Sequence, residues 1–315
     1  MSLVEQALRK IQAQAQARNA EAATREASQK LPIAGNPPAG DASSQAAAPT
    51  ASVANMLATV AQRAPLVIDQ AKLRAAGLLP PLEHERLVTR QLRAIKHALL
   101  RKMANDPLAA ESVVRTVMVT SGVPGDGKSF FSINLAMSMA MEKDLMVLLV
   151  DADVLKPHIT TELGLAGQTG LLDILADPNA DIVSCLQPTQ TRGLFFLPAG
   201  RASDVATELL SSDRMVSVIR QLVGLHQGLL VIFDSSPMLV TAEAQSLASL
   251  MSQILLIVRS GITPQAVVRQ TVELLAGDIS KVSMVLNDAR DADASNYEYG
   301  AYGAYGDAAR AARKE

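Results

Sequence analysis

The residues Gly122 to Ser129 read GVPGDGKS, which matches the pattern G-x-x-x-x-G-K-[ST] between an apolar segment and a helical one. Glycines in this position let backbone N–H groups curve around phosphate oxygens, and the N-terminus of the following helix adds partial positive charge. Lys128 would reach the β- and γ-phosphates of a nucleotide, and the Ser129 hydroxyl would ligate Mg²⁺. A glycine-rich turn that binds nothing is the alternative, but the complete pattern in this context favours a site for ATP and Mg²⁺. The residues expected to bind the nucleotide here are Gly122, Pro124, Gly125, Asp126, Gly127, Lys128, Ser129 and Phe130.

Two further apolar segments end in carboxylates. The segment MVLLVDAD ends with Asp151 and Asp153, and LLVIFDSSP carries Asp234 where its apolar run stops. An aspartate after a strand often only starts a turn or caps a helix. Here, however, two such sites and a phosphate-binding loop would meet at one edge of a sheet, where the magnesium of a nucleotide needs oxygen ligands. We therefore expect Asp151 and Asp234, together with Ser129, to hold Mg²⁺.

Apolar runs of strand length alternate with helical segments along the centre of the chain. The runs predict strands at 115–121, 146–151, 194–198, 229–234, 254–258 and 282–287. Helices are predicted at 128–142, 170–176, 212–225, 241–251 and 264–276. This alternation predicts an α/β fold with a doubly wound, mostly parallel sheet. Ligands bind such sheets at the carboxyl ends of the strands, where the loop and the carboxylates fall.

The whole chain divides into four segments: 1–30, 31–68, 69–287 and 288–315. Residues 1–30 are predicted to form a helix, which would either fray alone or dock on a partner. Residues 31–68 are rich in Ala, Pro, Ser, Gly and Gln and are predicted to be a flexible linker before the main domain, 69–287. A helix over 83–105, with apolar residues at helical spacing, precedes the first strand of that domain. Residues 288–315 contain no Val, Ile, Leu, Met or Phe, so we expect a disordered tail.

Composition excludes several classes of protein. The formal net charge of −2 gives no electrostatic basis for nucleic-acid binding. The single cysteine, Cys185, excludes an internal disulfide framework and suits a reducing compartment. No apolar run reaches the length of about 18 residues typical of a membrane span, and the N-terminus has no signal-peptide pattern. We expect a cytoplasmic protein.

With these three motifs, the chain resembles the bacterial tyrosine kinases, a MinD/ParA-like branch of the P-loop ATPases. Within that family it is similar to the exosortase-associated tyrosine autokinases of exopolysaccharide operons, from about Gln70 to the C-terminus. The resemblance identifies residues 122–129 as the Walker A loop, MVLLVDAD with Lys156 and Pro157 as Walker A′, and LLVIFDSSP as Walker B. It also implies that Asn287, at the end of the last predicted strand, contacts the adenine.

Two features favour the kinases over the ParA and MinD ATPases. Those ATPases carry a second lysine early in the loop, whereas this chain has Val123. The tail, in addition, reads NYEYGAYGAYG, and the family phosphorylates a C-terminal tyrosine cluster on neighbouring subunits. The expected phosphate acceptors are all four tyrosines of the chain: Tyr297, Tyr299, Tyr302 and Tyr305.

Three positions depart from the family pattern. Leu155 stands where the A′ motif usually has Arg, and Ser236 replaces the first of two prolines after Walker B. Arg90 occupies the acidic place of the motif Glu-x-x-Arg-x-x-Arg/Lys, through which the helix before the domain builds subunit contacts in the family.

The resemblance implies an ATP-dependent protein-tyrosine autokinase that phosphorylates its tail in trans and regulates exopolysaccharide or capsule synthesis and export. The catalytic residues would be Lys128, Asp151, Asp153 and Asp234, with Asp153 accepting the tyrosine proton. Its expected partners are a transmembrane chain-length protein that activates it at the inner face of the plasma membrane, further copies of itself, and an opposing phosphatase. A ParA/MinD-like ATPase switch and a non-catalytic ATP-binding regulator are the alternatives.

Overall fold

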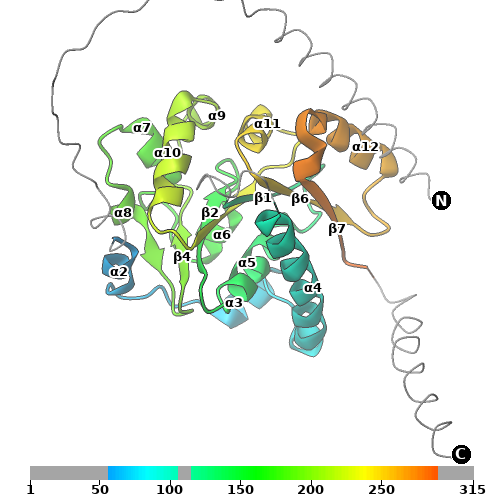
Figure 1. Cartoon of the computed structure of the whole chain (residues 1–315), viewed down its shortest axis with the longest axis horizontal. Coiled ribbons are helices and arrows are strands. Elements are labelled where there is room, and N and C mark those ends of the chain that lie inside the picture. Colours follow the sequence, from blue (N-terminus) through cyan, green and yellow to red (C-terminus); the bar gives the residue numbers. More distant parts are fainter. Residues whose placement is uncertain (1–55, 106–114, 290–315) are drawn as a thin grey trace, which may run out of the picture.

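The computed structural model of the chain describes residues 56–105 and 115–289 (Figure 1). The predicted N-terminal helix, most of the predicted linker and the tyrosine-bearing tail lie outside the described residues.

The described part of the chain is built on a seven-stranded sheet with the strand order β3-β4-β2-β5-β1-β6-β7. All neighbouring strands are parallel except β3, which runs antiparallel to β4 at one edge. The mostly parallel, doubly wound sheet predicted from the alternating pattern is therefore confirmed. The strands are β1 (Thr116–Ser121), β2 (Met146–Ala152), β3 (Gln187–Pro188), β4 (Leu194–Leu197), β5 (Leu229–Ser235), β6 (Gln253–Arg259) and β7 (Val282–Asn287).

Helices cover both faces of this sheet (Figure 1). Side chains of successive β1 residues point to opposite faces, so Val117 and Val119 join one apolar cluster while Met118 joins the other. The first of these clusters includes residues of α3 (Gln70–Ala75), α4 (Glu85–Ala104), α5 (Lys128–Met139) and α6 (His158–Glu162). The second includes residues of α2 (Met56–Ala61), α7 (Leu171–Ala176), α8 (Ile182–Cys185), α9 (Ala206–Leu210), α10 (Asp213–Gly224) and α11 (Ala242–Ser249). Between β6 and β7 the chain forms α12 (Gln265–Leu274) and a 3₁₀ turn, η4 (Ala276–Lys281); a second such turn, η2 (Leu82–His84), precedes α4.

Helix α4 confirms the helix predicted before the first strand, and it packs as part of the main domain. Its stripe of Leu92 and Leu99 is buried against the sheet face that α5 also covers. Lys96 lies in the same stripe, and its Nζ is 2.6 Å from Glu142 Oε1. A buried ammonium group needs such a partner, because desolvation would otherwise disfavour its charge.

The linker predicted for residues 31–68 is wrong from Met56 onwards. Helix α2 begins there, and its Leu57 and Val60 are almost fully buried in the core. Leu66 then pairs with the β3 edge, where its N–H donates to the carbonyl of Pro188 at 2.7 Å. The segment is rich in alanine overall, but its few larger apolar residues are enough to hold it on the core.

Among the described residues, no helix is both long and apolar enough for a membrane crossing.

Candidate active site

The loop predicted to bind phosphate connects the inner strand β1 to α5, whose first residue is Lys128. Gly125 and Gly127 have φ values of +89° and +94°, a left-handed backbone that side-chain-bearing residues rarely adopt. Backbone N–H groups of Met238 and Leu239, after β5, donate to the carbonyls of Ser121 and Gly122. The start of the loop is thereby tied to the segment that follows the neighbouring strand.

The far side of the loop is held by the segment after β6 and by the end of β7. The Nδ2 group of Asn287 donates to the backbone carbonyl of Asp126 at 2.9 Å, and Thr263 Oγ1 donates to Asp126 Oδ1 at 2.6 Å. A Cβ atom on Gly127 would overlap Asn287 Nδ2, so any other residue there would have to displace this amide. Asn287 thus supports the loop itself; its predicted contact with adenine stays a prediction.

The carboxylates predicted to hold Mg²⁺ lie side by side beneath the loop. The Cα atoms of Asp151 and Asp234 are in register on β2 and β5, and both side chains are fully buried. Asp151 Oδ2 accepts hydrogen bonds from the N–H and Oγ1 of Thr160, both at 2.8 Å. Asp234 Oδ1 accepts one from Ser132 Oγ at 2.8 Å. The other oxygens, Asp151 Oδ1 and Asp234 Oδ2, have no hydrogen-bond partner within the part of the chain that the structure describes.

The burial of these two carboxyls changes their acidity. Desolvation, reinforced by the charge of Asp234, raises the pKa of Asp151 to about 8. Burial also raises the pKa of Asp234, to about 6, while the neighbouring hydroxyls of Ser129 and Ser132 and the charge of Lys128 limit the shift. Two buried carboxyls with unpartnered oxygens are a site that a cation would stabilise.

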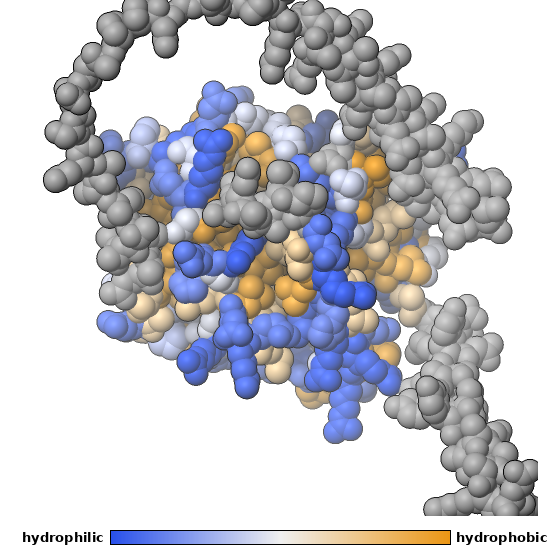
Figure 2. Space-filling view, in the orientation of Figure 1, coloured by the Kyte–Doolittle hydropathy of each residue, from blue (hydrophilic) through white to orange (hydrophobic). Residues whose placement is uncertain are grey.

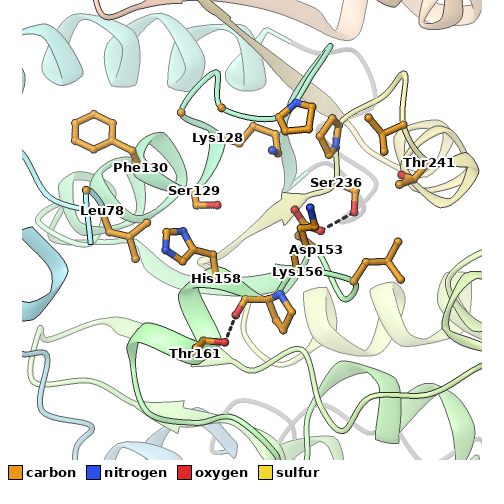
Figure 3. A pocket seen from close by; sticks show the side chains of 18 residues that line it. Leu78, Lys128, Ser129, Phe130, Asp153, Lys156, His158, Thr161, Ser236 and Thr241 are labelled. Atoms are coloured by element: carbon orange, nitrogen blue, oxygen red, sulfur yellow. Dashed lines mark hydrogen bonds between the residues drawn. The ribbon is translucent and has the colours of Figure 1, made fainter. Parts of the chain in front are cut away.

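A cavity of about 590 Å³ opens in front of the loop (Figure 3). Seven predicted site residues line it: Pro124, Gly125, Gly127, Lys128, Ser129, Phe130 and Asp153. Asp151 and Asp234 lie in the buried layer behind, Asp126 and Asn287 form the clamp on the far side of the loop, and Gly122 packs tightly against α12. The structure therefore brings the loop and one of the three predicted carboxylates to the cavity surface.

Asp153 is the carboxylate that faces the cavity. Its Oδ1 accepts a hydrogen bond from Ser236 Oγ at 2.9 Å, drawn as a dashed line in Figure 3. Ser236 is the residue that departs from the proline expected after Walker B, and here it orients the predicted base. Leu155, a second of the three departures, lines the same cavity with 56% of its surface exposed.

Several residues of the site were not expected from the sequence. Gly77 and Leu78 enter the cavity wall from the turn after α3, and Asn134 Nδ2 holds that turn by donating to the carbonyl of Leu78 at 2.8 Å. His158 also lines the cavity, where it is labelled in Figure 3. No local pattern marks such residues, because tertiary packing alone brings them to the loop.

Among the described residues, no group of three or more His, Cys, Asp and Glu side chains could enclose a metal. A magnesium ion that arrives with a nucleotide does not need such a group, since one or two carboxylates usually suffice beside phosphates and waters.

Known proteins similar to this chain agree with the geometry. A family profile described as ParA: NUBPL iron-transfer P-loop NTPase matches residues 112–223. The tyrosine-protein kinase YwqD of Bacillus subtilis is 32% identical over 187 residues, which are 59% of this chain and 77% of YwqD. The putative tyrosine-protein kinase EpsB of Ralstonia solanacearum is 33% identical over 184 residues, 58% of this chain and 24% of EpsB. This chain therefore corresponds to about a quarter of the longer relative.

Solved structures lead to the same group. The kinase domain of VpsO superposes with a TM-score of 0.55 at 29% identity, over 67% of this chain and all of that domain. The kinase domain of the Escherichia coli tyrosine kinase Etk superposes with a TM-score of 0.54 at 24% identity, over 65% and 78% of the two chains, and shows the shared fold.

The fold and the loop define a P-loop NTPase of the ParA-like class, a class that binds a nucleotide together with a divalent cation. Within this class the chain belongs to the bacterial tyrosine kinase family. The resemblance inferred from the three motifs is thus confirmed, and the ParA/MinD switch is the weaker interpretation.

Proposed function

We propose that this protein is an ATP-dependent protein-tyrosine autokinase that phosphorylates the tyrosines of its own C-terminal tail on neighbouring copies. The observation that supports this most directly is the arrangement of three carboxylates around one P-loop. Two are buried beneath Ser129, each with one oxygen that has no hydrogen-bond partner among the described residues, and the third faces the cavity where a phenol could enter.

The residues present fit a magnesium ion. Asp151 Oδ1 and Asp234 Oδ2 are buried oxygens without a partner, and a cation would repay the cost of ionising them. Asp151, Asp234 and Ser129 would hold Mg²⁺, directly or through water, and the ion would offset the negative charge of the phosphates. The loop N–H groups and Lys128, whose side chain is largely buried, would hold the phosphates of ATP.

Asp153 would act as the base in the transfer step. The phenol oxygen attacks the γ-phosphorus, the bond to the bridging oxygen breaks to leave ADP, and the phenol proton passes to the Asp153 carboxylate. The hydrogen bond from Ser236 fixes the orientation of Asp153 without occupying its second oxygen. Most of the rate would come from positioning and from stabilisation of charge around the transferred group.

The substrate would be supplied by the chain itself. Tyr297, Tyr299, Tyr302 and Tyr305 all fall within nine residues, in a tail rich in glycine and alanine. A tail of this composition can present several phenols in turn to the active site of a second copy, so self-association is part of the proposal. An opposing protein-tyrosine phosphatase would return the tail to its starting state.

The proposed setting is polysaccharide synthesis or export at the inner face of the plasma membrane. YwqD and EpsB are named as tyrosine kinases, and another relative, ExoP of Rhizobium meliloti, is named for succinoglycan biosynthesis transport and is 32% identical over 171 residues. A transmembrane chain-length protein would recruit and activate this chain through a cytosolic segment.

The test is mass spectrometry of the C-terminal peptide before and after incubation of the purified protein with ATP and Mg²⁺. We expect phosphate on the tail tyrosines of the wild type. In Lys128→Met the phosphotyrosine signal should fall by at least about 10²-fold, because this variant loses an electrostatic contact to the transferred group. Nucleotide hydrolysis without any phosphotyrosine would instead support the ATPase switch. Lys143→Met, at an exposed site after α5, is the matched control and should behave as the wild type.

A further inference from the structure

Helix α4 presents a row of exposed basic residues on one face. They follow one another at intervals of three or four residues, which places them on the same side of a helix: Arg86, Arg90, Arg93, His97 and Arg101. The 20-residue helix carries six Arg or Lys residues and a single acid, Glu85, in a chain whose formal net charge is −2. Figure 2 shows hydrophilic side chains gathered along the lower edge of the molecule, where Figure 1 places α3 and α4.

The first half of this face forms a pocket of about 520 Å³, separate from the ATP cavity. It is lined by Leu82, Glu85, Arg86, Thr89, Arg90 and Arg93. The charge of Glu85 is already engaged, because Arg74 Nη2 lies 3.0 Å from its Oε2. Within the described residues, neither Arg86 nor Arg93 has a carboxylate within the 4.0 Å of an ion pair. The pocket therefore offers guanidinium groups to an anion from outside.

The chain itself contains a segment with the complementary charge. Residues 291–307 carry four carboxylates, no Lys or Arg, and all four tyrosines. Phosphorylation would add about −1.5 to −2 charge per tyrosine, and guanidinium groups bind phosphate through two parallel hydrogen bonds. Leu82, which is 70% exposed at the pocket, offers an apolar contact to an aromatic ring. Arginines beside an exposed apolar residue suit an aryl phosphate.

We propose that the pocket formed by Arg86, Arg90 and Arg93 binds the phosphorylated tyrosine tail of this chain, residues 291–307. This inference rests on the proposed function, which supplies the phosphate. Phosphorylation would then change where the tail binds: a neutral phenol enters the ATP cavity, where carboxylates surround the loop, and a phosphotyrosine is repelled there and held on α4.

The reach of the tail is comparable to the length of helix α4. Tyr297 and Tyr305 are eight and sixteen residues beyond Ala289, the last described residue, and an extended chain of that length spans about 26 to 53 Å. Helix α4 is about 30 Å long.

An anionic membrane surface fits the basic face of α4 less well than the tail does, because membrane-surface helices bury an exposed apolar face in the lipid. The apolar stripe of α4, with Leu92 and Leu99, is instead buried in the core.

The experiment measures the binding of synthetic peptides by fluorescence anisotropy, so it needs no kinase activity. The labelled peptide comprises residues 290–308, either phosphorylated on its four tyrosines or unphosphorylated. The protein is the full chain with Tyr297→Phe, Tyr299→Phe, Tyr302→Phe and Tyr305→Phe, which has no phosphate of its own to compete. We expect the phosphorylated peptide to bind at least about tenfold more tightly than the unphosphorylated one, and more weakly as salt is raised.

The combined variant Arg86→Gln, Arg90→Gln and Arg93→Gln should lose at least about tenfold in affinity for the phosphopeptide, the equivalent of about one charge-assisted hydrogen bond. The matched control removes three exposed basic residues elsewhere: Lys143→Gln, Arg192→Gln and Arg220→Gln. It should bind as the parent protein does. Because all six positions are exposed, both variants should keep the parent melting temperature, and the single variant Arg93→Gln, with a smaller loss, checks the assignment if the combined variant does not fold.

Equal affinity for the two peptides, or an unchanged affinity in the arginine variant, would overturn the proposal. So would sedimentation of the protein with phosphatidylglycerol vesicles that depends on the three arginines while the phosphopeptide fails to bind, because the face would then be a membrane surface. A protein that phosphorylates its tail but does not bind the phosphopeptide would leave the proposed function standing and refute this site alone.

Discussion

Asp151 and Asp234 are direct partners in the parallel ladder between β2 and β5, so two fully buried carboxyls stand next to each other at the end of the central strands. Each has one oxygen in a hydrogen bond and one without. A fold that served stability alone would not keep this pair, because burial of a charge without a partner is costly. The pair is therefore best understood as a binding site whose cost is offset when a cation and a nucleotide arrive.

This pair should make the nucleotide-free protein less stable as the pH rises. Both carboxyls have a pKa above the ordinary value of 3.8, at about 8 for Asp151 and about 6 for Asp234. Between pH 3.8 and about pH 8 the folded protein binds more protons at these two carboxyls than the unfolded chain does. Their contribution to the free energy of unfolding therefore falls as the pH rises. Asp151→Asn keeps an oxygen for Thr160 and gives Asp234 an amide donor. At pH 8 the melting temperature of this variant should exceed that of the wild type, by about 2–4 °C for each kcal/mol gained in the free energy of unfolding. At pH 6 the difference should be smaller.

Asp173 provides a control, because its contribution to stability should depend on pH in the opposite direction. Burial alone would raise its pKa, but hydrogen bonds from Arg201 and Gly170 and the charge of Arg201 outweigh burial and lower the pKa. Its stabilising contribution is therefore present at neutral pH and lost as the pH falls through its lowered pKa, so Asp173→Asn should melt at a lower temperature than the wild type at pH 7. If thermal melts show Asp151→Asn below the wild type at pH 8, the interpretation of the buried pair is wrong.

The clamp between Asn287 and the loop predicts different costs for two neighbouring glycines. Gly125 and Gly127 have similar φ values, +89° and +94°, so alanine at either should cost about 1–2 kcal/mol of backbone strain. A Cβ on Gly125 would meet open space, whereas one on Gly127 would overlap the Asn287 amide. Gly127→Ala should therefore lower the melting temperature more than Gly125→Ala does.

A double variant isolates the contact with Asn287. Adding Asn287→Ala to Gly127→Ala removes the overlap, so the two changes together should destabilise the protein by less than the sum of the single changes. Additive effects in this cycle would mean that Asn287 does not restrain the loop.

Much of this architecture could be predicted because its signals are local. Each long strand is a continuous apolar run, and the loop is a contiguous motif between a strand and a helix. Short helices such as α6 and α9 were missed, since five residues contain too little periodicity to detect. The hydrogen bonds from Thr160 to Asp151 could not be predicted either, because nothing in the sequence indicates that the Thr160 hydroxyl reaches this buried carboxyl. Such contacts depend on packing between elements, and those of Thr160 oppose the rise in the pKa of Asp151 that burial causes.

The position of Leu155 allows a positively charged side chain to be introduced at the mouth of the cavity. It is 56% exposed and lines the cavity where the resemblance places an arginine. Leu155→Arg should lower the KM for ATP, because an added guanidinium can bind phosphate oxygens. The uncharged polar change Leu155→Gln is the control and should leave KM close to that of the wild type. If both variants shift KM alike, the loss of the leucine side chain is responsible, not the added charge.

The carboxylate at the cavity surface gives the sharpest test of the chemistry. Asp153→Asn keeps an oxygen for the hydrogen bond from Ser236 but can no longer accept a proton. The rate of tyrosine phosphorylation should fall by about 10²-fold or more, while the affinity for ATP stays within a few-fold of the wild type. Ser236→Ala removes only the orienting hydrogen bond, so its rate should fall less than that of Asp153→Asn and its pH profile should resemble the wild type. Single-turnover phosphate transfer and equilibrium nucleotide binding, measured on the same preparations, separate the two effects. Equal losses in rate and in ATP affinity for Asp153→Asn would assign Asp153 to metal or nucleotide binding, and a base would then have to be sought elsewhere in the cavity.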